Sequence, residues 1–464
     1  MGAFVAIDMK SFYASVECVY RDLNPLEANL LVADESRSDQ TICLAVSPAL
    51  KKKGVPARPR LFEAKQSIAL WEKRNRRKLS WLIAVPRMAE YERVSALIYS
   101  VILKYVSPED VHVYSIDESF VNCEPYLHLY RKEAEKRLVE PAHVMAMNIV
   151  KDILHMTGIT ATVGIGTNMY LAKVCMDIIA KKAPPDRDGV RIAELNEDSY
   201  CYLLWNHRPL TDFWMIGRGK ARRLEKARLF TMGDIARKSQ YDEEWFYKEF
   251  GIDAEILIDH AWGREPVTMR DIKAYRTESR SLSKGQVLPA PYEFAETRIV
   301  FSEMIDVLCA DMFEKNLLSS VFTWWVCYDW KSLEHCPSYA GPLSLDWYGR
   351  LHPRHNLGTV RTRERTNSLR LVRNVLLESF DRNTNHLLLF RRLGLCASDV
   401  TPDDGICQLD LFTDYAGLEK EKKIQAAMLK VRSKYGANAL FTGKNLLKGA
   451  TNLERNKQIG GHKA

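Results

Sequence analysis

The sequence has 464 residues, of which 46% are hydrophobic, 27% are charged and 10% are aromatic. These proportions are typical of folded globular proteins and exclude a disordered, collagenous or fibrous chain. At roughly 100–200 residues per domain, the length predicts three or four domains. Lys and Arg number 67 against 59 Asp and Glu, so the formal net charge is +8, which permits a polyanionic partner without requiring one.

Cysteine usage and the amino terminus predict the compartment. The ten cysteines include no Cys-x-x-Cys pair and no tight Cys/His cluster, which argues against a zinc site and favours reduced core thiols. The first eight residues contain no basic stretch, and Asp8 comes before an apolar region could form, so we expect no signal peptide. No apolar run approaches the ~18 residues that would span a bilayer. We therefore expect a cytoplasmic protein without a membrane partner.

The first part of the chain predicts a sheet that carries an insertion. Residues 3–8 read as a short buried strand that ends in an acid, and residues 12–20 read as a helix with an apolar face. A carboxylate at the carboxyl end of a strand is typical of catalytic sites in open α/β sheets. Residues 21–82 are polar and basic, which favours a small subdomain inserted into the sheet.

The following segment alternates helices and strands and predicts an α+β fold. Periodicity and turn residues indicate a helix over 88–105, a β-hairpin over 111–123, a helix over 143–156, a strand over 160–165 and a helix over 168–181. The glycines at 164 and 166 read as a turn between the last two of these elements.

The second half of the chain divides at changes in composition. The Ala-Pro-Pro-Asp stretch at 183–186 ends the first unit, and a mainly helical unit follows over 190–265. Residues 266–285 are basic with little periodicity, which suggests a linker. Residues 286–395 then mix a helix over 295–315 with a strand over 320–328, and a polar tail that includes one helix ends the chain.

Two adjacent acids in the hairpin, Asp117 and Glu118, are the strongest chemical feature of the sequence. An unpaired carboxylate that faces a buried interior is costly, so something positive should meet at least one of them. Together with Asp8 they could bind two divalent cations, as in two-metal sites for phosphoryl transfer. The alternative is a surface hairpin whose acids are merely solvated, and a short Asp-Glu motif by itself favours that alternative.

Three motifs occur in one order and with a consistent spacing. They are Asp-Met-Lys-Ser-Phe-Tyr at 8–13, Ser-Ile-Asp-Glu at 115–118, and Thr-Val-Gly-Ile-Gly-Thr-Asn at 162–168 followed by Leu-Ala-Lys at 171–173. This set closely resembles the Y-family of translesion DNA polymerases, and within it the UmuC/ImpB/MucB/SamB-like bacterial branch. The resemblance covers the first ~265 residues by motif and the next ~130 by position and charge.

The resemblance implies an α+β, multidomain, right-hand polymerase. Its parts would be a palm formed by 1–20 and 83–185, fingers formed by 21–82, a thumb with a helix-hairpin-helix formed by 186–265, a basic linker at 266–285, a little finger formed by 286–395 and a tail at 396–464. The implied activity is low-fidelity, DNA-template-directed DNA synthesis opposite damage, with primer-template DNA and deoxynucleoside triphosphates as substrates.

The same resemblance assigns the catalytic and nucleotide-binding residues. Asp8, Asp117 and Glu118 would bind two Mg²⁺ ions, with the backbone carbonyl of Met9 as a further ligand, since Mg²⁺ prefers hard oxygen donors. The expected contacts to the incoming nucleotide come from Phe12, Tyr13, Ser47, Lys51 and Lys173. Tyr13 matches the steric gate that leaves no room for a ribose 2′-hydroxyl, whereas the alternative for Phe12 and Tyr13 is a place in the core. Pro48 departs from the family pattern, in which a tyrosine at this position can donate to the triphosphate.

Basic and glycine-rich stretches predict the contacts to DNA. Gly217, Arg218, Gly219 and Lys220 resemble the phosphate-binding turn of the family's thumb. Between 351 and 395 there are nine Arg and three acids, and this strip matches the position of the little finger. In both places the alternative is a solvated basic face.

A short apolar motif in the tail predicts a protein partner. Gln408, Leu409, Leu411 and Phe412 resemble the peptide that binds the bacterial sliding clamp, and clamp tethering would raise the local concentration at a primer end. The alternative is that this peptide packs on its own domain. A recombinase or another SOS protein is a further partner that the resemblance allows.

Two other functions remain open at this point. One is a DNA-binding scaffold subunit of a mutasome with little activity alone, against which the intact set of three acids argues. The other is a palm-type nucleotidyl cyclase, which would explain the acids but neither the thumb motif nor the tail peptide.

Overall fold

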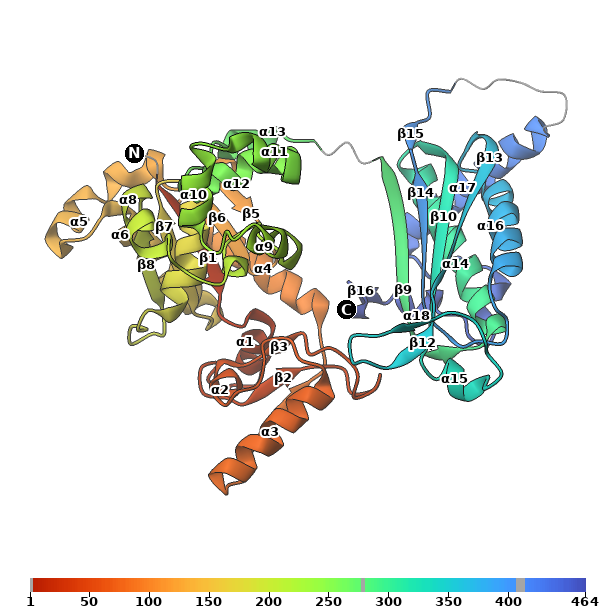
Figure 1. The fold of residues 1–464 in the computed structure, drawn as a ribbon, viewed down its shortest axis with the longest axis horizontal. Coiled ribbons are helices and arrows are strands. Elements are labelled where there is room, and N and C mark those ends of the chain that lie inside the picture. Colours follow the sequence, from red (N-terminus) through yellow and green to blue (C-terminus); the bar gives the residue numbers. More distant parts are fainter. Residues whose placement is uncertain (1–2, 277–279, 406–413) are drawn as a thin grey trace. The chain divides into compact units, whose positions relative to one another are not determined.

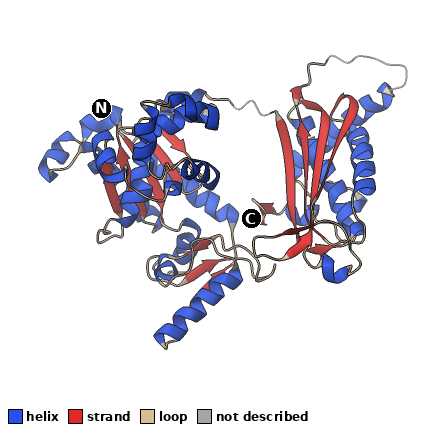
Figure 2. Cartoon of the chain, viewed as in Figure 1, coloured by secondary structure: helices blue, strands red, loops and turns tan. Residues whose placement is uncertain are grey.

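The computed structural model describes residues 3–276, 280–405 and 414–464. The chain divides into two compact units, one formed by Met1–Tyr275 with His462–Ala464 and the other by Arg276–Gly461. Figure 1 traces the chain through both units, and Figure 2 shows that each contains helices and strands. Each unit has its own apolar core, so each is described by itself.

The first unit is built on a five-stranded sheet with the order β5 (Val111–Val113), β6 (Glu118–Asn122), β1 (Phe4–Met9), β7 (Ala161–Gly166) and β8 (Arg191–Leu195). All neighbouring strands are antiparallel except β7 and β8. Helix α6 (Pro141–Thr157) packs on β1 and β7, and α4 (Met88–Ile102) packs on α6. Strand β8 lies at the start of residues 190–265, for which the sequence predicted a mainly helical unit. This strand forms because it pairs with the buried strand β7, and its own sequence does not signal that pairing.

The glycines at 164 and 166 lie inside β7 rather than in a turn, so that expectation was wrong. A Cβ atom at Gly164 would lie 2.2 Å from the carbonyl oxygen of Ala172, and one at Gly166 would lie 2.2 Å from the Ala172 nitrogen. These glycines therefore allow helix α7 (Met169–Val174) to lie directly on the strand. The helix continues as a π-turn over Cys175–Ile179 and a 3₁₀ turn over Ala180–Lys182.

Residues between α1 and α4 form a small subdomain with its own core. After α1 (Phe12–Val19), strands β2 (Leu30–Val32), β3 (Ala45–Val46) and β4 (Leu82–Ala84) form a sheet with the order β3-β2-β4, accompanied by α2 (Pro48–Lys52) and α3 (Leu61–Asn75). The basic residues of this stretch lie on its surface, while apolar side chains such as Leu31, Leu50 and Ile68 fill its interior.

A bundle of short helices completes the first unit. Its members are α8 (Glu197–Leu204), α9 (Arg218–Lys226), α10 (Met232–Ser239), α11 (Glu243–Phe250) and α12 (Asp253–Ala261), whose apolar faces enclose Leu224, Ile235 and Phe246. Helix α13 (Met269–Ala274) follows the bundle and packs on β5. The Trp214 indole donates a hydrogen bond to the Tyr114 hydroxyl at 3.0 Å and thereby joins this bundle to the sheet.

The second unit is a five-stranded antiparallel sheet, in which four long strands lie side by side and two helices cover one face (Figure 1). The strand order is β13 (Asn356–Thr366), β10 (Leu317–Tyr328), β14 (Phe390–Ser398) and β9 (Ser281–Tyr292), and the helices are α14 (Phe294–Glu314) and α16 (Leu369–Asn383). Phe322, Trp324 and Leu395 point to the helices and are buried. Strand β15 (Thr401–Pro402) pairs with the start of β10.

Shorter elements connect these parts. They are η1 (Pro108–Asp110), η2 (Glu124–Leu129), α5 (Arg131–Arg137) and η5 (Leu210–Asp212) in the first unit, and α15 (Ser332–His335), β11 (Leu343–Leu345), β12 (Leu351–Pro353), η6 (Gly443–Leu446), α18 (Asn452–Arg455) and β16 (Gln458–Ile459) in the second, with β17 (His462–Lys463) after it. No helix of the described residues combines the length and the apolarity of a membrane span.

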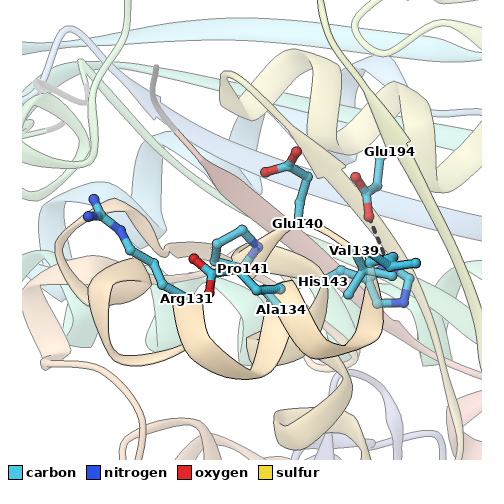
Figure 3. Close-up of a pocket in the computed structure, with 9 residues that line it drawn as sticks. Arg131, Ala134, Val139, Glu140, Pro141, His143 and Glu194 are labelled. Carbon is cyan, nitrogen blue, oxygen red and sulfur yellow. Dashed lines mark hydrogen bonds and ion pairs between the residues drawn. The ribbon is translucent and has the colours of Figure 1, made fainter.

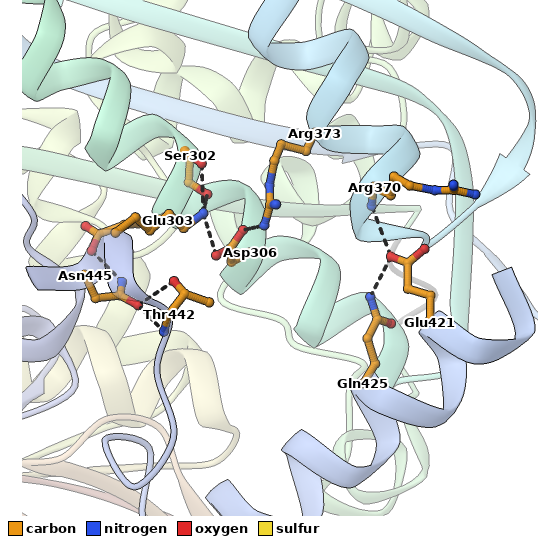
Figure 4. A network of polar contacts seen from close by, with 10 residues as sticks. Ser302, Glu303, Asp306, Arg370, Arg373, Glu421, Gln425, Thr442 and Asn445 are labelled. Atoms are coloured by element: carbon orange, nitrogen blue, oxygen red, sulfur yellow. Dashed lines mark hydrogen bonds and ion pairs between the residues drawn. The ribbon is translucent and has the colours of Figure 1, made fainter. Parts of the chain in front are cut away.

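The tail for which the sequence predicted one helix begins with α17 (Tyr415–Tyr435) and then folds back on α14. Figure 4 shows the polar contacts that hold it. The buried carboxylate of Glu303 accepts hydrogen bonds from the Asn445 side chain at 2.6 Å and from the backbone N–H groups of Thr451 and Asn452 at 2.8 and 3.1 Å. The ammonium of Lys444 lies 2.6 Å from Asp306 on the same helix. Hydrogen bonds and an ion pair therefore hold the last part of the tail against α14.

Candidate active site

Strand register places the predicted carboxylates together. Asp8 on β1 lies opposite Glu118 on β6 and opposite Thr162 on β7. Asp117 precedes β6, and its carbonyl oxygen accepts a hydrogen bond from the backbone N–H of Met9 at 2.9 Å. The three acids thus come from the adjoining ends of two paired strands, as the order of the motifs predicted.

A cavity of about 410 Å³ opens in front of these strand ends. Its lining comes from the end of β1, the start of α1, the subdomain that contains α2, and the stretch before β6: Asp8, Met9, Lys10, Ser11, Phe12, Tyr13, Leu44, Ala45, Lys51, Ala57, Arg58, Ile116, Asp117, Thr162 and Lys181. Three predicted metal ligands, Asp8, Met9 and Asp117, therefore share one cavity with three predicted nucleotide contacts, Phe12, Tyr13 and Lys51.

Glu118 lies behind Asp117 and is 9% exposed. Its Oε2 accepts a hydrogen bond from Lys173 Nζ at 2.7 Å, whereas its buried Oε1 has no aligned hydrogen-bond donor in the described residues. Burial raises the pKa of the Glu118 carboxyl, and the charge of Lys173 opposes that rise. The Lys173 ammonium also lies 2.7 Å from Oε1, so a metal ion at Glu118 would compete with this lysine for the carboxylate.

Two lysines and a further acid surround the predicted metal ligands. Lys181 Nζ lies 2.9 Å from Oδ2 of Asp8 and 2.7 Å from Oδ1 of Asp177. Lys173 Nζ lies 3.0 Å from Oδ2 of Asp177. The nearby carboxylates raise the pKa of both lysines against the opposing effect of burial, which is individually the largest influence. Asp8, Glu118 and Asp177 thus each pair with an ammonium, whereas the carboxylate of Asp117 accepts a hydrogen bond from the Ser115 hydroxyl at 2.7 Å.

The carboxylates at this site are ligands of the kind that Mg²⁺ prefers, but in this structure Asp8 and Glu118 pair with lysines. No three His, Cys, Asp or Glu side chains among the described residues converge as they would around a metal ion. Asp8, Asp117 and Glu118 nevertheless supply only carboxylate oxygens, which Mg²⁺ prefers, and Asp8 and Glu118 are direct neighbours across the sheet. Rotation of these side chains away from the lysines is the change that metal binding requires.

Tyr13 stands on a rigid base. Its ring stacks on that of Tyr91, with centroids 4.5 Å apart and an interplanar angle of 21°. Tyr91 is fully buried and donates its hydroxyl hydrogen bond to Oε1 of Glu17 at 2.8 Å. Phe12 is also buried, in agreement with a part in packing, although it contributes to the cavity lining.

The predicted nucleotide contacts divide into two groups. Lys51 lines the cavity and donates a hydrogen bond to the Ser11 hydroxyl at 2.9 Å, while burial lowers the pKa of its ammonium group. Ser47 is buried inside its subdomain, where its hydroxyl accepts from the backbone N–H of Leu30. Lys173 is held between Glu118 and Asp177 and does not line the cavity. The structure therefore brings Lys51 to the cavity, and leaves Ser47 and Lys173 outside it.

Three cationic residues of the cavity were missed by the sequence analysis: Lys10, Arg58 and Lys181. Burial and the neighbouring charges of Arg191 and Lys51 lower the pKa of Lys10 to about 8. A signal for Lys181 was present, because lysines at 173 and 181 with an acid midway at 177 repeat at helical spacing. The positions of Lys10 and Arg58 depend on chain packing and carried no such signal.

The predicted thumb contacts lie at the start of α9. Gly217, Arg218 and Gly219 are exposed, and an added Cβ at either glycine would meet no atom within 4 Å. Lys220 forms an ion pair with Asp253 at 2.8 Å, so part of its charge is already compensated. The predicted clamp residues Gln408, Leu409, Leu411 and Phe412 lie outside the described residues.

A second hollow of about 550 Å³ lies between α5 and α6, and Figure 3 shows its lining. His143 Nδ1 lies 2.7 Å from Oε1 of Glu194 there, and Leu138 and Glu140 belong to the rim. None of the predicted catalytic or nucleotide-binding residues lines this hollow. The cavity at the ends of β1 and β6 is therefore the candidate active site.

Comparisons with known proteins agree with this geometry. The model of the impB/mucB/samB family matches residues 7–177, which include all three predicted carboxylates. The putative UV-damage repair protein UvrX of Bacillus subtilis (strain 168) is 29% identical over 99% of this chain and 97% of its own length. DNA polymerase IV 2 of the same organism is 27% identical over 98% and 97%, and its DNA repair protein homolog YozK is 38% identical over 24% and 90%.

One solved structure shows the fold. The Y-family DNA polymerase chimera Dbh-Dpo4(243-245)-Dbh matches 86% of this chain and 99% of its own length with a TM-score of 0.58 and 18% sequence identity. A likeness of this extent confirms the predicted multidomain α+β class, with palm, fingers, thumb and little finger.

Proposed function

Because this chain belongs to the impB/mucB/samB branch of the Y-family DNA polymerases, we propose that it is a low-fidelity, DNA-templated DNA polymerase that acts in translesion synthesis. The observation that carries the proposal is the cavity in which Asp8 and Asp117 lie beside Tyr13 and a group of cationic side chains. A scaffold subunit would have no use for this combination, and no observation favours a cyclase.

The carboxylates are the proposed metal ligands. Asp8, Asp117 and Glu118, with the carbonyl of Met9, would hold two Mg²⁺ ions, which would lower the pKa of the primer 3′-hydroxyl and neutralise charge on the triphosphate. The sheet register fixes the spacing of Asp8 and Glu118, so the protein contributes position and electrostatic stabilisation rather than a nucleophile.

The nucleotide would occupy the cavity with its sugar against Tyr13 and its triphosphate against the cations. Lys51, Arg58 and Lys181 line the cavity and are the side chains that we assign to the phosphates, in place of Lys173. Ala45 and Ala57 line the same cavity, and their small side chains leave room for a distorted base pair.

The remaining partners follow from the same function. Primer-template DNA would contact the exposed turn at Gly217–Gly219 and Lys220 through its phosphates. The tail peptide with Gln408 and Phe412 is proposed to bind a bacterial sliding clamp, and a recombinase or another SOS protein is a further candidate. Chromosomal DNA as the substrate would place the enzyme in the cytoplasm.

Primer extension tests the proposal. The full chain is incubated with Mg²⁺, deoxynucleotides and a labelled primer on intact and abasic templates, and compared with Asp117→Asn and with Asp117→Ala/Glu118→Ala. Extension should require Mg²⁺ and should fall by at least about 100-fold in Asp117→Asn, since electrostatic groups at the reacting centre typically contribute that much. Glu124→Ala, which removes an exposed carboxylate of the same unit, should extend primers like the wild type.

The outcome separates enzyme from scaffold. Extension that persists in both carboxylate variants would disprove the assignment of the metal ligands. Absence of extension in the wild type, together with intact salt-sensitive DNA binding, would favour the mutasome scaffold.

A further inference from the structure

A chain of ion pairs links two of the predicted metal ligands, Asp8 and Glu118, through residues outside the metal-binding set. It runs from Asp8 to Lys181 at 2.9 Å, on to Asp177 at 2.7 Å, then to Lys173 at 3.0 Å and to Glu118 at 2.7 Å. Asp177 is the central member, because it alone contacts both lysines.

Local helix geometry explains why one acid can serve two lysines. Lys173 and Lys181 stand four residues before and four residues after Asp177, and side chains four residues apart lie on the same helical face. The π-turn over Cys175–Ile179 widens the helix at this point, and π-turns are frequent at functional sites. Lys173 is almost fully buried, whereas the Lys181 side chain is 42% exposed and is free to move toward solvent.

We propose that the Lys181 ammonium neutralises the Asp8 carboxylate until a divalent cation binds there. Asp177 is then the positioning residue that keeps Lys181 in an ion pair after it leaves Asp8. This inference rests on the proposed metal-dependent function and names a step that precedes nucleotide binding. Lys173 supplies the same countercharge to Glu118.

Electrostatics requires such an exchange. An ammonium at 2.9 Å from Asp8 Oδ2 and a divalent ion on the same carboxylate would repel each other strongly, so Lys181 must move before the ion binds. With Asp177 as an acceptor at 2.7 Å, Lys181 leaves Asp8 without becoming an unpaired charge beside a cation. Without Asp177, Lys181 would have Asp8 as its main remaining partner, and the cation would have to displace it at a greater cost.

Metal binding in the absence of DNA and nucleotide tests this exchange. The probe is Mn²⁺, which accepts the same oxygen ligands as Mg²⁺ and whose free concentration is measured by electron paramagnetic resonance. The full chain is titrated as wild type, Lys181→Met, Asp177→Asn and the double variant. A salt concentration of about 0.15 M screens charges farther than about 8 Å, which limits indirect field effects. Thermal unfolding of each variant confirms that it is folded.

The two single variants should change metal affinity in opposite directions. Lys181→Met removes the competitor, so Mn²⁺ should bind about three- to ten-fold more tightly, in keeping with a partly exposed ion pair. Asp177→Asn should weaken binding about three- to ten-fold, because Lys181 then stays on Asp8. When Lys181 is already Met, Asp177→Asn should weaken Mn²⁺ binding by less than about two-fold, because the effects of two coupled residues are not additive. Asp242→Asn, which breaks a Lys–Asp pair of the same sequence spacing between Lys238 on α10 and the residue before α11, should leave the affinity unchanged.

Two results would overturn the proposal while leaving the proposed function intact. Unchanged affinity in Lys181→Met would show that the ammonium does not compete with the cation. An equal Asp177→Asn penalty with and without Lys181 would show that Asp177 is itself a metal ligand. Absence of Mn²⁺ binding in the wild type would instead refute the metal site on which both ideas depend.

Discussion

Tyr13 illustrates how a single side chain depends on residues that never reach the substrate cavity. Its ring rests on Tyr91, and the Tyr91 hydroxyl is bound by the buried carboxylate of Glu17. Glu17 in turn pairs with Arg87 at 3.0 Å and with Arg21. Aromatic stacking of this kind contributes about 0.5–1.5 kcal/mol beyond burial, and the hydrogen bond fixes the ring that supports Tyr13.

Sugar discrimination should therefore depend on both rings. We expect Tyr13→Ala to raise the ratio of ribonucleotide to deoxynucleotide incorporation at least about ten-fold, because the barrier to a 2′-hydroxyl is removed. Tyr91→Ala should raise the same ratio by a smaller factor, because the Tyr13 ring is still present but has lost the ring on which it stacks. The measurement is kcat/KM for each sugar with single-nucleotide insertion.

Tyr91→Phe is the matched control, since it keeps the stacked ring and loses only the hydrogen bond to Glu17. Its discrimination ratio should stay close to that of the wild type. A Tyr91→Ala enzyme with unchanged discrimination and normal kcat/KM for deoxynucleotides would contradict the supporting role of Tyr91.

At the scale of elements, α14 organises the second unit through acids on the side where the tail lies. Glu303 accepts four hydrogen bonds from the segment between Asn445 and Asn452, and Asp306 pairs with Lys444 and Arg373. A buried carboxylate is tolerated when its oxygens accept hydrogen bonds. Loss of the carboxylate or of its donors leaves buried polar groups without a partner, which destabilises the fold. The end of the chain is thus stabilised by contacts that local sequence cannot reveal.

Replacement of the buried acid should release the tail before it unfolds the unit. We expect Glu303→Ala to lower the free energy of unfolding by about 2–4 kcal/mol, because two side-chain donors and two backbone donors lose their acceptor. Limited proteolysis should cut the variant between 436 and 456 faster than the wild type, while the sheet is still folded. Chemical denaturation followed by circular dichroism provides the free energy.

Glu314→Ala is the control for this change, because Glu314 is an exposed acid at the end of the same helix. Cleavage of both variants at the rate of the wild type would show that Glu303 does not hold the tail.

At the scale of the whole molecule, the parts predicted from sequence are those whose signal is local. The predicted fold class and family are confirmed. They could be predicted because each of three elements carries its own sequence pattern: the strand with Asp8, the hairpin with Asp117 and Glu118, and the strand with the two glycines. The metal-binding and nucleotide-binding roles of these residues stay predictions.

The errors concern features that only packing decides. The glycines of β7 were read as a turn, although they serve close contact with α7. The nucleotide contact of Ser47 stays a prediction, and packing places its hydroxyl against the backbone N–H of Leu30. Lys181 was missed although its helical spacing from Asp177 is visible in the sequence, because only the π-turn in the helix and the fold of β1 decide that it meets Asp8. The tail contact joins residues 142 positions apart, a separation at which sequence patterns carry no information.

The net charge of +8 matters for function only where the charge is gathered, and β13 is such a place. Arg361 and Arg363 are exposed at alternate positions of this edge strand, and Arg361 lies opposite Val321 on the face turned away from the buried Trp324. Helices cover the other face, so this one is available to a phosphate backbone. Each phosphate contact releases counterions and makes binding depend on salt.

We therefore expect Arg361→Ala/Arg363→Ala to weaken primer-template binding for all sequences and to reduce the slope of log affinity against log salt by about 2. Fluorescence anisotropy between about 50 and 300 mM salt measures the slope. Arg382→Ala/Lys423→Ala removes the same charge from α16 and α17 and should leave the slope unchanged. Equal slopes in both double variants would mean that net charge alone attracts DNA, whereas a change only on β13 would identify this strand as part of the DNA-binding face.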